Sequence, residues 1–566
     1  MRVLGSFEDF NEILTRCKEI KRNLYPYLSI YYRETKNLHM NPNNIYLDTS
    51  EGRMMRPLIK VSSSNSTSTS ITFEDKIKSG EIEWIDPREQ NLIYICSHKE
   101  IPKDYHTHQE LHDSFLFSQN SGSIPLLNHD KSARNQLAAG MRLQEVGHPF
   151  LNSKRTTTDY SYHLYYPQKP ISTTIISKAM NVEEQPCTTN CICMVYTLPH
   201  NQEDAIIVSR SFLERGGFRI FAQRTYEFII KKPEILGIHH EHKKENLDVD
   251  GLIQIGTIIQ KNSILGSKIN SITKEHTGYI YFTDSINELQ PKAFQYRVNS
   301  ILITNDILGN LLVKFTIGHV KPGEIGDKFE ARGQKGSLGS IWNQEDLPFN
   351  SMGMQPDVII NPHGIPSRMT IGFLFQLGFD KVKLYDSNFK EIDLSSFADF
   401  KVEELQKKLF ENGFHSSNKE RFYDGLSGEL ITDPINVGLM NYGRLAHFSA
   451  NKKQQAEQAA ISFNTKQPVR GKKNNGVVRF GEMEAQTIAS EGGAHTLYSK
   501  FTRGANEEVQ IKQCKTCLDW NDPNASRCRK CQSMELSQIF NVTHSAFTIE
   551  ENLYACGIKL KPEYVF

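Results

Sequence analysis

The sequence predicts a mixed α+β protein whose central part is mostly β-structure, and three observations lead to this expectation. The β-branched run at 358–360 is followed by Asn361 and Pro362, and proline ends strand pairing. Short apolar runs at 278–282 and 301–304 are separated by polar turns, as short strands are. Two Cys-x-x-Cys pairs near the C-terminus favour a small ribbon held by a metal ion.

Composition limits the classes of protein that the chain can belong to. Its 566 residues suggest three or four domains, and its formal net charge of +1 does not by itself indicate a nucleic-acid binder. The ten cysteines lack the spacing of a disulfide framework, which favours a reducing, intracellular compartment. No run approaches 18 apolar residues, so no membrane span is expected.

The most informative motif is GDKFEARGQKG at 326–336, which contains Lys328 and Lys335. Glycines within and after it let the backbone turn tightly or approach a ligand closely. Each lysine presents a compact ammonium that suits phosphate oxygens. The spacing of a P-loop is absent, and a solvated basic loop is the alternative for this motif considered by itself.

The four cysteines near the C-terminus predict structural zinc. Each pair forms one knuckle, and four thiolates complete tetrahedral Zn²⁺ without leaving a position for substrate. The ligands are Cys514, Cys517, Cys528 and Cys531.

Two other groups could be mistaken for metal sites. Cys187, Cys191 and Cys193 are better explained by a strand with small apolar residues on one face. The histidines at 239–242 lie in a highly charged stretch, which favours a solvated loop.

Longer motifs resemble the second-largest subunit of multisubunit RNA polymerases, in that family's order. The matching segments are SEGRMMRPL at 50–58, YYPQKP at 165–170, NQED at 201–204, WNQEDLPF at 342–349, MQPDVIINPHGIPSRMT at 354–370, YGRLAH at 442–447 and GVVRFGEME at 476–484. The resemblance covers only the family's C-terminal half, so a split subunit is expected, with a separate polypeptide supplying the N-terminal half. The C-terminal ribbon favours the archaeal, eukaryotic or viral branch.

The resemblance implies a domain plan with a double-psi β-barrel at its centre. The expected segments are an external region at 1–124, the first part of a hybrid-binding core at 125–218, a wall or flap at 219–320, the second part of the core at 321–447, anchor helices at 448–502 and a zinc-binding clamp segment at 503–566.

The resemblance also implies roles for individual residues. Catalytic contacts to the nucleotide, the second Mg²⁺ and the RNA 3′ end are expected from Glu203, Asp204, Lys328, Lys335, Arg368 and Arg134, with Asp204 as a partial ligand of that Mg²⁺. Contacts to the backbone of the RNA–DNA hybrid are expected from Lys452, Lys466, Arg470, Lys472, Lys473 and Arg479.

These roles predict the C-terminal part of a DNA-directed RNA polymerase subunit, active only in complex with the largest subunit. Expected partners are that subunit, small assembly subunits, DNA template, RNA transcript and NTPs, with no membrane. The expected cofactors are structural Zn²⁺ and Mg²⁺ shared with the largest subunit. A cytoplasmic location, a viral factory or a virion is favoured over the nucleus. The alternative function is a non-catalytic nucleic-acid-binding or assembly module derived from the same subunit.

Overall fold

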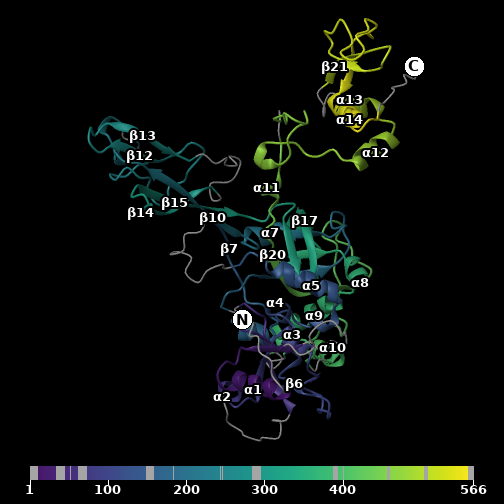
Figure 1. The fold of residues 1–566 in the computed structure, drawn as a ribbon. Coiled ribbons are helices and arrows are strands. Elements are labelled where there is room, and N and C mark those ends of the chain that lie inside the picture. The colour runs from purple at the N-terminus through teal and green to yellow at the C-terminus, as the bar shows by residue number, and fades with distance from the viewer. Residues whose placement is uncertain are drawn as a thin grey trace. The chain divides into compact units, whose positions relative to one another are not determined.

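The computed structural model describes residues 10–32, 45–50, 52–61, 73–147, 159–182, 184–242, 244, 246–282, 295–386, 393–398, 401–455, 459–502 and 508–558. Two compact units divide the chain, Met1–Phe448 and Ser449–Phe566 (Figure 1). The serine- and threonine-rich stretch at 62–70, which the sequence predicts as a surface loop, lies outside the described residues. Within the described ranges, no helix has both the length and the apolar character needed to cross a bilayer.

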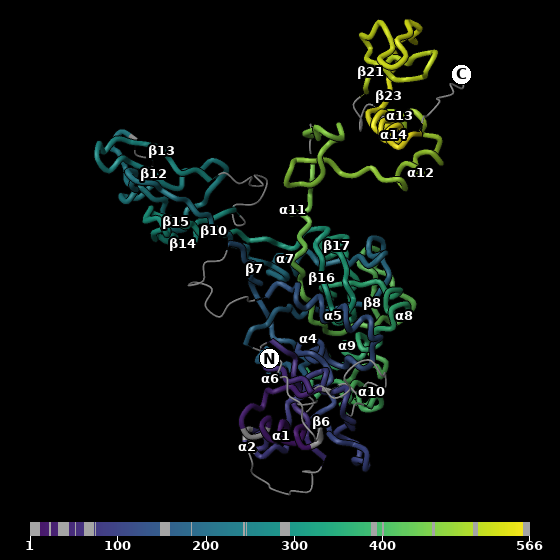
Figure 2. Tube along the Cα trace, viewed as in Figure 1, coloured from purple at the N-terminus to yellow at the C-terminus, as the bar shows by residue number. Residues whose placement is uncertain are grey.

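A closed six-stranded barrel lies at the centre of the first unit. Its strand order is β16-β17-β9-β18-β8-β20, and β20 pairs back with β16. The strands are β8 (Thr189–Val195), β9 (Ala205–Ser209), β16 (Lys328–Ala331), β17 (Gln334–Trp342), β18 (Val358–Ile360) and β20 (Ile435–Arg444), with β19 (Lys419–Glu420) added beside β20. Pairs β17–β9 and β18–β8 are parallel, and the other barrel pairs are antiparallel. The colours of Figure 2 show that these strands come from distant parts of the chain.

Side chains alternate between the inside and the outside of the barrel along each strand, and those on the inside are apolar. Cys191 and Cys193 point into the core from β8, as predicted for this strand, and pack with Val208, Phe329 and Leu338. Burial raises the pKa of the Cys193 thiol to about 12, so this side chain is a neutral core residue. The barrel is therefore a packed scaffold, and polar chemistry is confined to its ends and its surface.

A helix fixes one end of the barrel. After β18, the chain forms α8 (Gly364–Arg368), turns at Met369 with φ of 55° and enters α9 (Ile371–Tyr385). A Cβ atom on Gly438 would lie 2.3 Å from the carbonyl oxygen of Leu377, so glycine lets α9 lie directly against β20. This packing holds Arg368, at the end of α8, close to the barrel strands.

Three groups of elements complete the first unit. The N-terminal part contains α1 (Phe10–Asn23), β1 (Ser29–Tyr32), β2 (Ile45–Asp48), β3 (Arg56–Lys60), α2 (Phe73–Lys78), β4 (Ile82–Ile85), α3 (Pro87–Gln90), β5 (Ile95–Cys96) and β6 (His108–Glu110). Helices around the barrel are α4 (Gln119–Gly122), α5 (Ser132–Arg142), α6 (Ile175–Ala179), α7 (Arg210–Glu214) and α10 (Val402–Glu411). Two further sheets are formed by β7 (Tyr160–Leu164), β10 (Ile220–Ile230), β14 (Arg297–Asn305) and β15 (Leu311–Lys321), and by β11 (Glu234–Leu236), β12 (Ile264–Asn270) and β13 (His276–Tyr281).

The two strand predictions in this last region are confirmed with adjusted bounds, since 278–282 lies mostly in β13 and 301–304 lies inside β14. The histidine-rich stretch contains a short 3₁₀ turn, His240–His242.

The second unit is smaller and contains both helices and strands. Its elements are α11 (Ser449–Lys452), α12 (Glu482–Ser490), α13 (Ala494–Thr502), β21 (Glu508–Gln513), β22 (Trp520–Asn521), β23 (Phe540–Thr543) and α14 (His544–Ala555). The three strands form one sheet in the order β22-β21-β23, and the ring of Trp520 stacks on Phe547 of α14. One cysteine pair, Cys514 and Cys517, lies between β21 and β22, and the other, Cys528 and Cys531, lies between β22 and β23.

Candidate active site and metal centre

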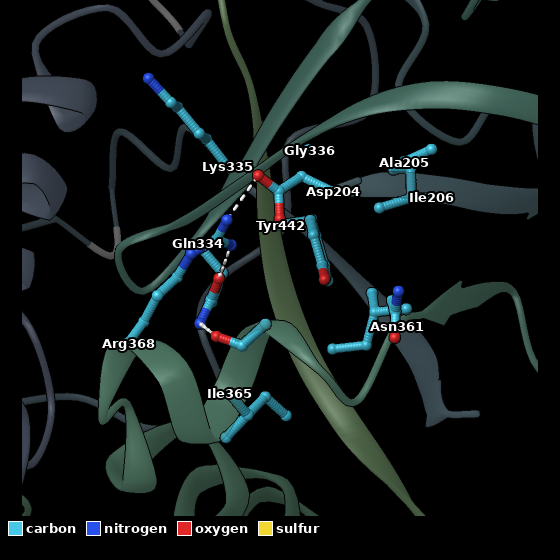
Figure 3. A pocket seen from close by; sticks show the side chains of 12 residues that line it. Asp204, Ala205, Ile206, Gln334, Lys335, Gly336, Asn361, Ile365, Arg368 and Tyr442 are labelled. Atoms are coloured by element: carbon cyan, nitrogen blue, oxygen red, sulfur yellow. Dashed lines mark hydrogen bonds and ion pairs between the residues drawn. The ribbon is translucent and has the colours of Figure 1, made fainter. Parts of the chain in front are cut away.

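A pocket at one end of the barrel brings together three of the predicted catalytic residues. Asp204, Lys335 and Arg368 all line it, and they come from the turn before β9, the start of β17 and the end of α8 (Figure 3). Gln334 and Tyr442 complete the polar part of the wall. The sequence separates these residues widely, and the barrel pairing brings them together.

A chain of hydrogen bonds orders the arginine in this pocket. Arg368 donates from Nη2 to Asp204 Oδ2 at 2.5 Å and from Nη1 to Gln334 Oε1 at 2.7 Å. Gln334 in turn donates to the hydroxyl of Thr370 at 2.6 Å and to the carbonyl of Gly364 at 3.0 Å. Arg368 is therefore held in one orientation by a residue, Gln334, that the sequence did not single out.

The acidic pair lies on a strained turn. Glu203 and Asp204 have φ values of 51° and 70°, a left-handed conformation that is costly for residues with a side chain. The buried side chain of Asn201 holds the turn, because it donates to the carbonyl of Tyr196 at 2.7 Å and accepts from the amide of Leu198 at 3.0 Å. The turn presents the exposed Glu203 carboxylate beside the half-buried Asp204 carboxylate.

Two glycines of β17 make room for this turn. A Cβ atom on Gly336 would lie 2.6 Å from the carbonyl oxygen of Asp204, and one on Gly339 would lie 2.5 Å from that of His200. Glycine in and after this motif predicts a tight turn or close approach to a ligand, and the group that approaches Gly336 and Gly339 is the backbone of the acidic turn and the residues before it.

Gly336→Ala tests this contact. We expect a loss of about 1–3 kcal/mol in the free energy of unfolding, because the obstructing atom belongs to the backbone and the strand or the turn must move. Gly140→Ala is the matched control, since Gly140 lies in α5 with no atom within 4 Å of its would-be Cβ and alanine favours helix. Urea unfolding of the full chain measures both, and equal stabilities of the two variants would contradict the proposed crowding.

The two lysines start on the same face of the β16–β17 hairpin. Lys328 lies opposite Ser337 and Lys335 lies opposite Glu330, so the lysines are diagonal neighbours in the ladder. Both side chains are exposed, and neither ammonium has a polar partner in the part of the chain that the structure describes. Figure 3 shows the side chain of Lys335 extending away from Asp204.

Arg134 approaches the turn of this hairpin from α5. A Cβ atom on Gly333 would lie 2.9 Å from the Arg134 carbonyl oxygen, so the helix start and the hairpin turn are in contact. The structure thus groups Asp204, Lys335 and Arg368 around the pocket, with Lys328 and Arg134 on the adjoining hairpin and helix.

Two buried ion pairs fix the hairpin at both ends. At its start, Arg444 donates to Asp327 at 2.6 Å, and at its turn Arg332 donates to Asp130 at 2.7 Å. All four side chains are almost completely buried, and desolvation lowers the pKa of both arginines. These pairs could not be predicted from the sequence, because an arginine in a basic loop is indistinguishable there from any other solvent-exposed cation.

The predicted hybrid-contacting residues all lie in the second unit. Lys452 ends α11, and Lys466 places its ammonium 4.8 Å from the centre of the Phe463 ring. Lys472 donates to the carbonyl of Asn451 at 2.7 Å, which ties its loop to α11. The side chains of Lys452, Arg470, Lys472, Lys473 and Arg479 are exposed.

The four predicted zinc ligands converge in the second unit. The four Sγ atoms lie within 4.8 Å of one another. Among the described residues, these four cysteines form the group of potential ligands that is close enough to hold a metal ion. Contacts of 3.5 Å join Cys514 to Cys531 and Cys517 to Cys528. Tetrahedral Zn²⁺ with Zn–S bonds of about 2.3 Å requires sulfur separations of about 3.8 Å, so the cluster fits that ion.

The pKa values of the clustered thiols are also consistent with a site that binds a cation. Although burial opposes it, the backbone amides of Cys531 and Lys530 lower the pKa of Cys528 to about 6. Burial raises the pKa of Cys517 to about 12, so the four thiols do not all ionise at neutral pH unless a cation offsets their charge.

Comparison with known proteins agrees with the geometry. The model of the family "RNA polymerase Rpb2, domain 6" matches residues 120–474, and the chain belongs to the family of second-largest RNA polymerase subunits. DNA-directed RNA polymerase subunit Rpo2 of Sulfolobus acidocaldarius is 28% identical over 568 residues, which cover 93% of this chain and 49% of that protein. DNA-directed RNA polymerase II subunit 2 of Arabidopsis thaliana is 30% identical over 493 residues, which cover 81% of this chain and 41% of that protein. The chain spans about half the length of the curated relatives it matches.

Proposed function

We propose that the chain supplies the C-terminal part of the second-largest subunit of a DNA-directed RNA polymerase. The observation that carries the proposal is the convergence of Asp204, Lys335 and Arg368 on one pocket in a member of this family. The proposed reaction is attack of an RNA 3′-hydroxyl on the α-phosphate of an NTP, which releases pyrophosphate.

The cations of the site neutralise phosphate charge in this proposal. Arg368 presents a planar guanidinium that can exchange the Asp204 carboxylate for two phosphate oxygens, and Arg134 stands beside the hairpin turn for a similar contact. Lys328 and Lys335 hold the backbone of the transcript near its 3′ end. Positioned charge of this kind is the main contribution that a protein makes to phosphoryl transfer.

Glu203 and Asp204 would hold the second Mg²⁺, in part through water, since Mg²⁺ keeps several waters and takes few carboxylates. When bound, this ion offsets the charge of the triphosphate. The donor set fits, because the exposed Glu203 carboxylate has no polar partner among the described residues and Asp204 is adjacent to it. The first Mg²⁺ would be held by the largest subunit, so the chain is proposed to act only in complex with it.

The finer structural assignments extend this proposal. The six-stranded barrel would have double-psi connectivity, the four-cysteine sheet would be a zinc ribbon, and the basic residues of the second unit would contact the RNA–DNA hybrid. The division at 124, 218, 320, 447 and 502 would separate external region, core, wall, core, anchor and clamp. A separate polypeptide would supply the N-terminal half, and the complex would act in the cytoplasm, a viral factory or a virion.

Lys335→Ala tests the catalytic role. In an enzyme reconstituted with a largest subunit and the remaining subunits on an RNA–DNA scaffold, we expect nucleotide addition to slow by about tenfold or more, because one preorganised cation is lost. Lys419→Ala is the control, since Lys419 is an equally exposed lysine on β19 of the same sheet.

Rates are compared at saturating NTP after native mass spectrometry shows equal assembly. Equal elongation by the two variants would remove Lys335 from the mechanism. A wild-type complex that assembles and binds the scaffold without adding nucleotides would favour the non-catalytic module.

A further inference from the structure

An acidic side chain is buried behind the lysine hairpin. Glu330 lies on β16, its exposure is only 3%, and it is the cross-strand partner of Lys335. Its Oε1 atom accepts a hydrogen bond of 2.7 Å from the amide of Gly333, in the turn of the hairpin. Glu330 therefore contacts both the turn and the strand that present the catalytic lysine.

A second carboxyl group meets Glu330 from the segment that follows α5. This segment is paired with the end of β20, because the amide of Val146 donates to the Arg444 carbonyl at 2.8 Å. The Glu145 side chain lies over Gly443, the residue that pairs with Glu330, and a Cβ atom on Gly443 would lie 2.4 Å from Glu145 Oε1. Absence of a side chain at Gly443 thus leaves the space in which the two carboxyl groups come within hydrogen-bonding reach.

The surroundings of Glu330 oppose a negative charge on its side chain. Burial and then the neighbouring Glu145 raise the pKa of Glu330 well above its usual value of 4.5. Arg142 is the cation that opposes this increase, and the Cys187 thiol, which donates to Glu145 Oε2 at 3.0 Å, is neutral. The Tyr442 hydroxyl is neutral as well.

Two other nearby cations are engaged elsewhere, since Arg332 is paired with Asp130 and Arg444 is paired with Asp327. Lys335 extends into solvent.

We propose that Glu330 and Glu145 are positioning residues that share one proton, and that this proton bridge fixes the lysine-bearing hairpin to the segment that directly follows α5, the helix that carries Arg134. The role of the bridge in catalysis rests on the proposed function, whereas the existence of the bridge does not depend on that function. The hairpin is proposed to hold the transcript near its 3′ end, and Arg134 of α5 is proposed to contact the triphosphate. The two are joined by a hydrogen bond that exists only while the proton stays.

The bridge predicts a pH dependence of definite sign. The folded pKa of Glu330 lies above the unfolded value, so the contribution of the bridge to stability is complete below about pH 4.5 and is lost as pH rises toward the folded pKa. Hydrogen exchange of the amides at 328–337, corrected for intrinsic rates, measures this. Above about pH 6 the opening constant should rise by up to about tenfold per pH unit, the slope for one proton.

Glu330→Gln is the decisive variant. Glutamine keeps an acceptor for the Gly333 amide and a permanent donor for Glu145, so the hairpin should stay protected and the pH slope should disappear. Glu345→Gln is the control, since Glu345 is exposed and should leave the slope unchanged. Failure of Glu330→Gln to fold, or a wild-type slope in this variant, would overturn the proposal.

Reconstituted enzyme tests the catalytic consequence separately. The ratio of nucleotide-addition rates, Glu330→Gln over wild type, should increase severalfold as the pH rises toward the folded pKa of Glu330, and the ratio for Glu345→Gln should stay constant. If this rate ratio does not change with pH but hydrogen exchange changes as predicted, the proton bridge exists and does not position the catalytic lysine. The Lys335→Ala result tests the proposed function independently of both measurements.

Discussion

Removal of zinc is expected to unfold residues 508–558 while the barrel of the first unit keeps its structure. The apolar contacts of this segment are few, so metal binding supplies much of its folding free energy, about 10–16 kcal/mol in zinc-finger peptides. Cys528→Ser should have the same effect as a chelator, because Cys528 is completely buried and accepts hydrogen bonds from the Lys530 amide and the Asn521 side chain. Native mass spectrometry should show one zinc per chain in the wild type and none in the variant.

Cys556→Ser is the matched control, since Cys556 is exposed and lies outside the cluster. It should retain one zinc and wild-type hydrogen exchange. Amide protection at 508–513 and 540–543, the two longer strands of the sheet, reports on the fold. Persistent protection of these strands after chelation would show that the metal is not structural.

Loss of the Arg444 guanidinium should destabilise the first unit by about 3–5 kcal/mol, the usual cost of leaving one member of a buried ion pair alone. Arg444 is 1% exposed, and besides Asp327 it donates to the carbonyls of Phe218 at 2.6 Å, Lys321 at 3.1 Å and Pro322 at 3.0 Å. Arg444→Met fills similar volume and removes every one of these donors. Urea unfolding of the full chain, followed by exchange at β16 and β17, measures the change.

Two further variants separate charge from packing. Asp327→Asn combined with Arg444→Met should recover part of the loss, because no uncompensated carboxylate remains buried. Lys407→Met is the control for a cation in an ion pair, since its side chain is 76% exposed and its pair with Glu411 spans 3.8 Å, so little change is expected. Equal effects of Arg444→Met and Lys407→Met would mean that the hairpin does not depend on its buried anchor.

The sequence predicted those parts of the site whose chemistry is local. Cys514, Cys517, Cys528 and Cys531 could be assigned because each knuckle is a contiguous stretch with a fixed ligand spacing. The groups at Asp204, Lys335 and Arg368 were anticipated through motifs that resemble a known family, and the barrel then placed them around one pocket.

The supporting contacts could not be predicted because their partners are distant in the sequence. Arg332 and Asp130 are 202 positions apart, and Arg444 and Asp327 are 117 positions apart. A single sequence records neither distance nor burial, so Glu330 was indistinguishable from an ordinary surface acid. Strands such as β13 and β14 were predicted from short apolar runs between polar turns, whereas their pairing partners required the structure.

The closure of the barrel affects how this protein can fold while the ribosome synthesises it. Strand β8 must wait for β20, its partner along seven positions from Thr189 to Val195, which is translated more than 200 residues later. At usual rates of synthesis this delay is on the order of tens of seconds, during which an apolar strand has unpaired edges. Nascent chains of this protein are therefore expected to need a chaperone until the residues of β20 have left the exit tunnel.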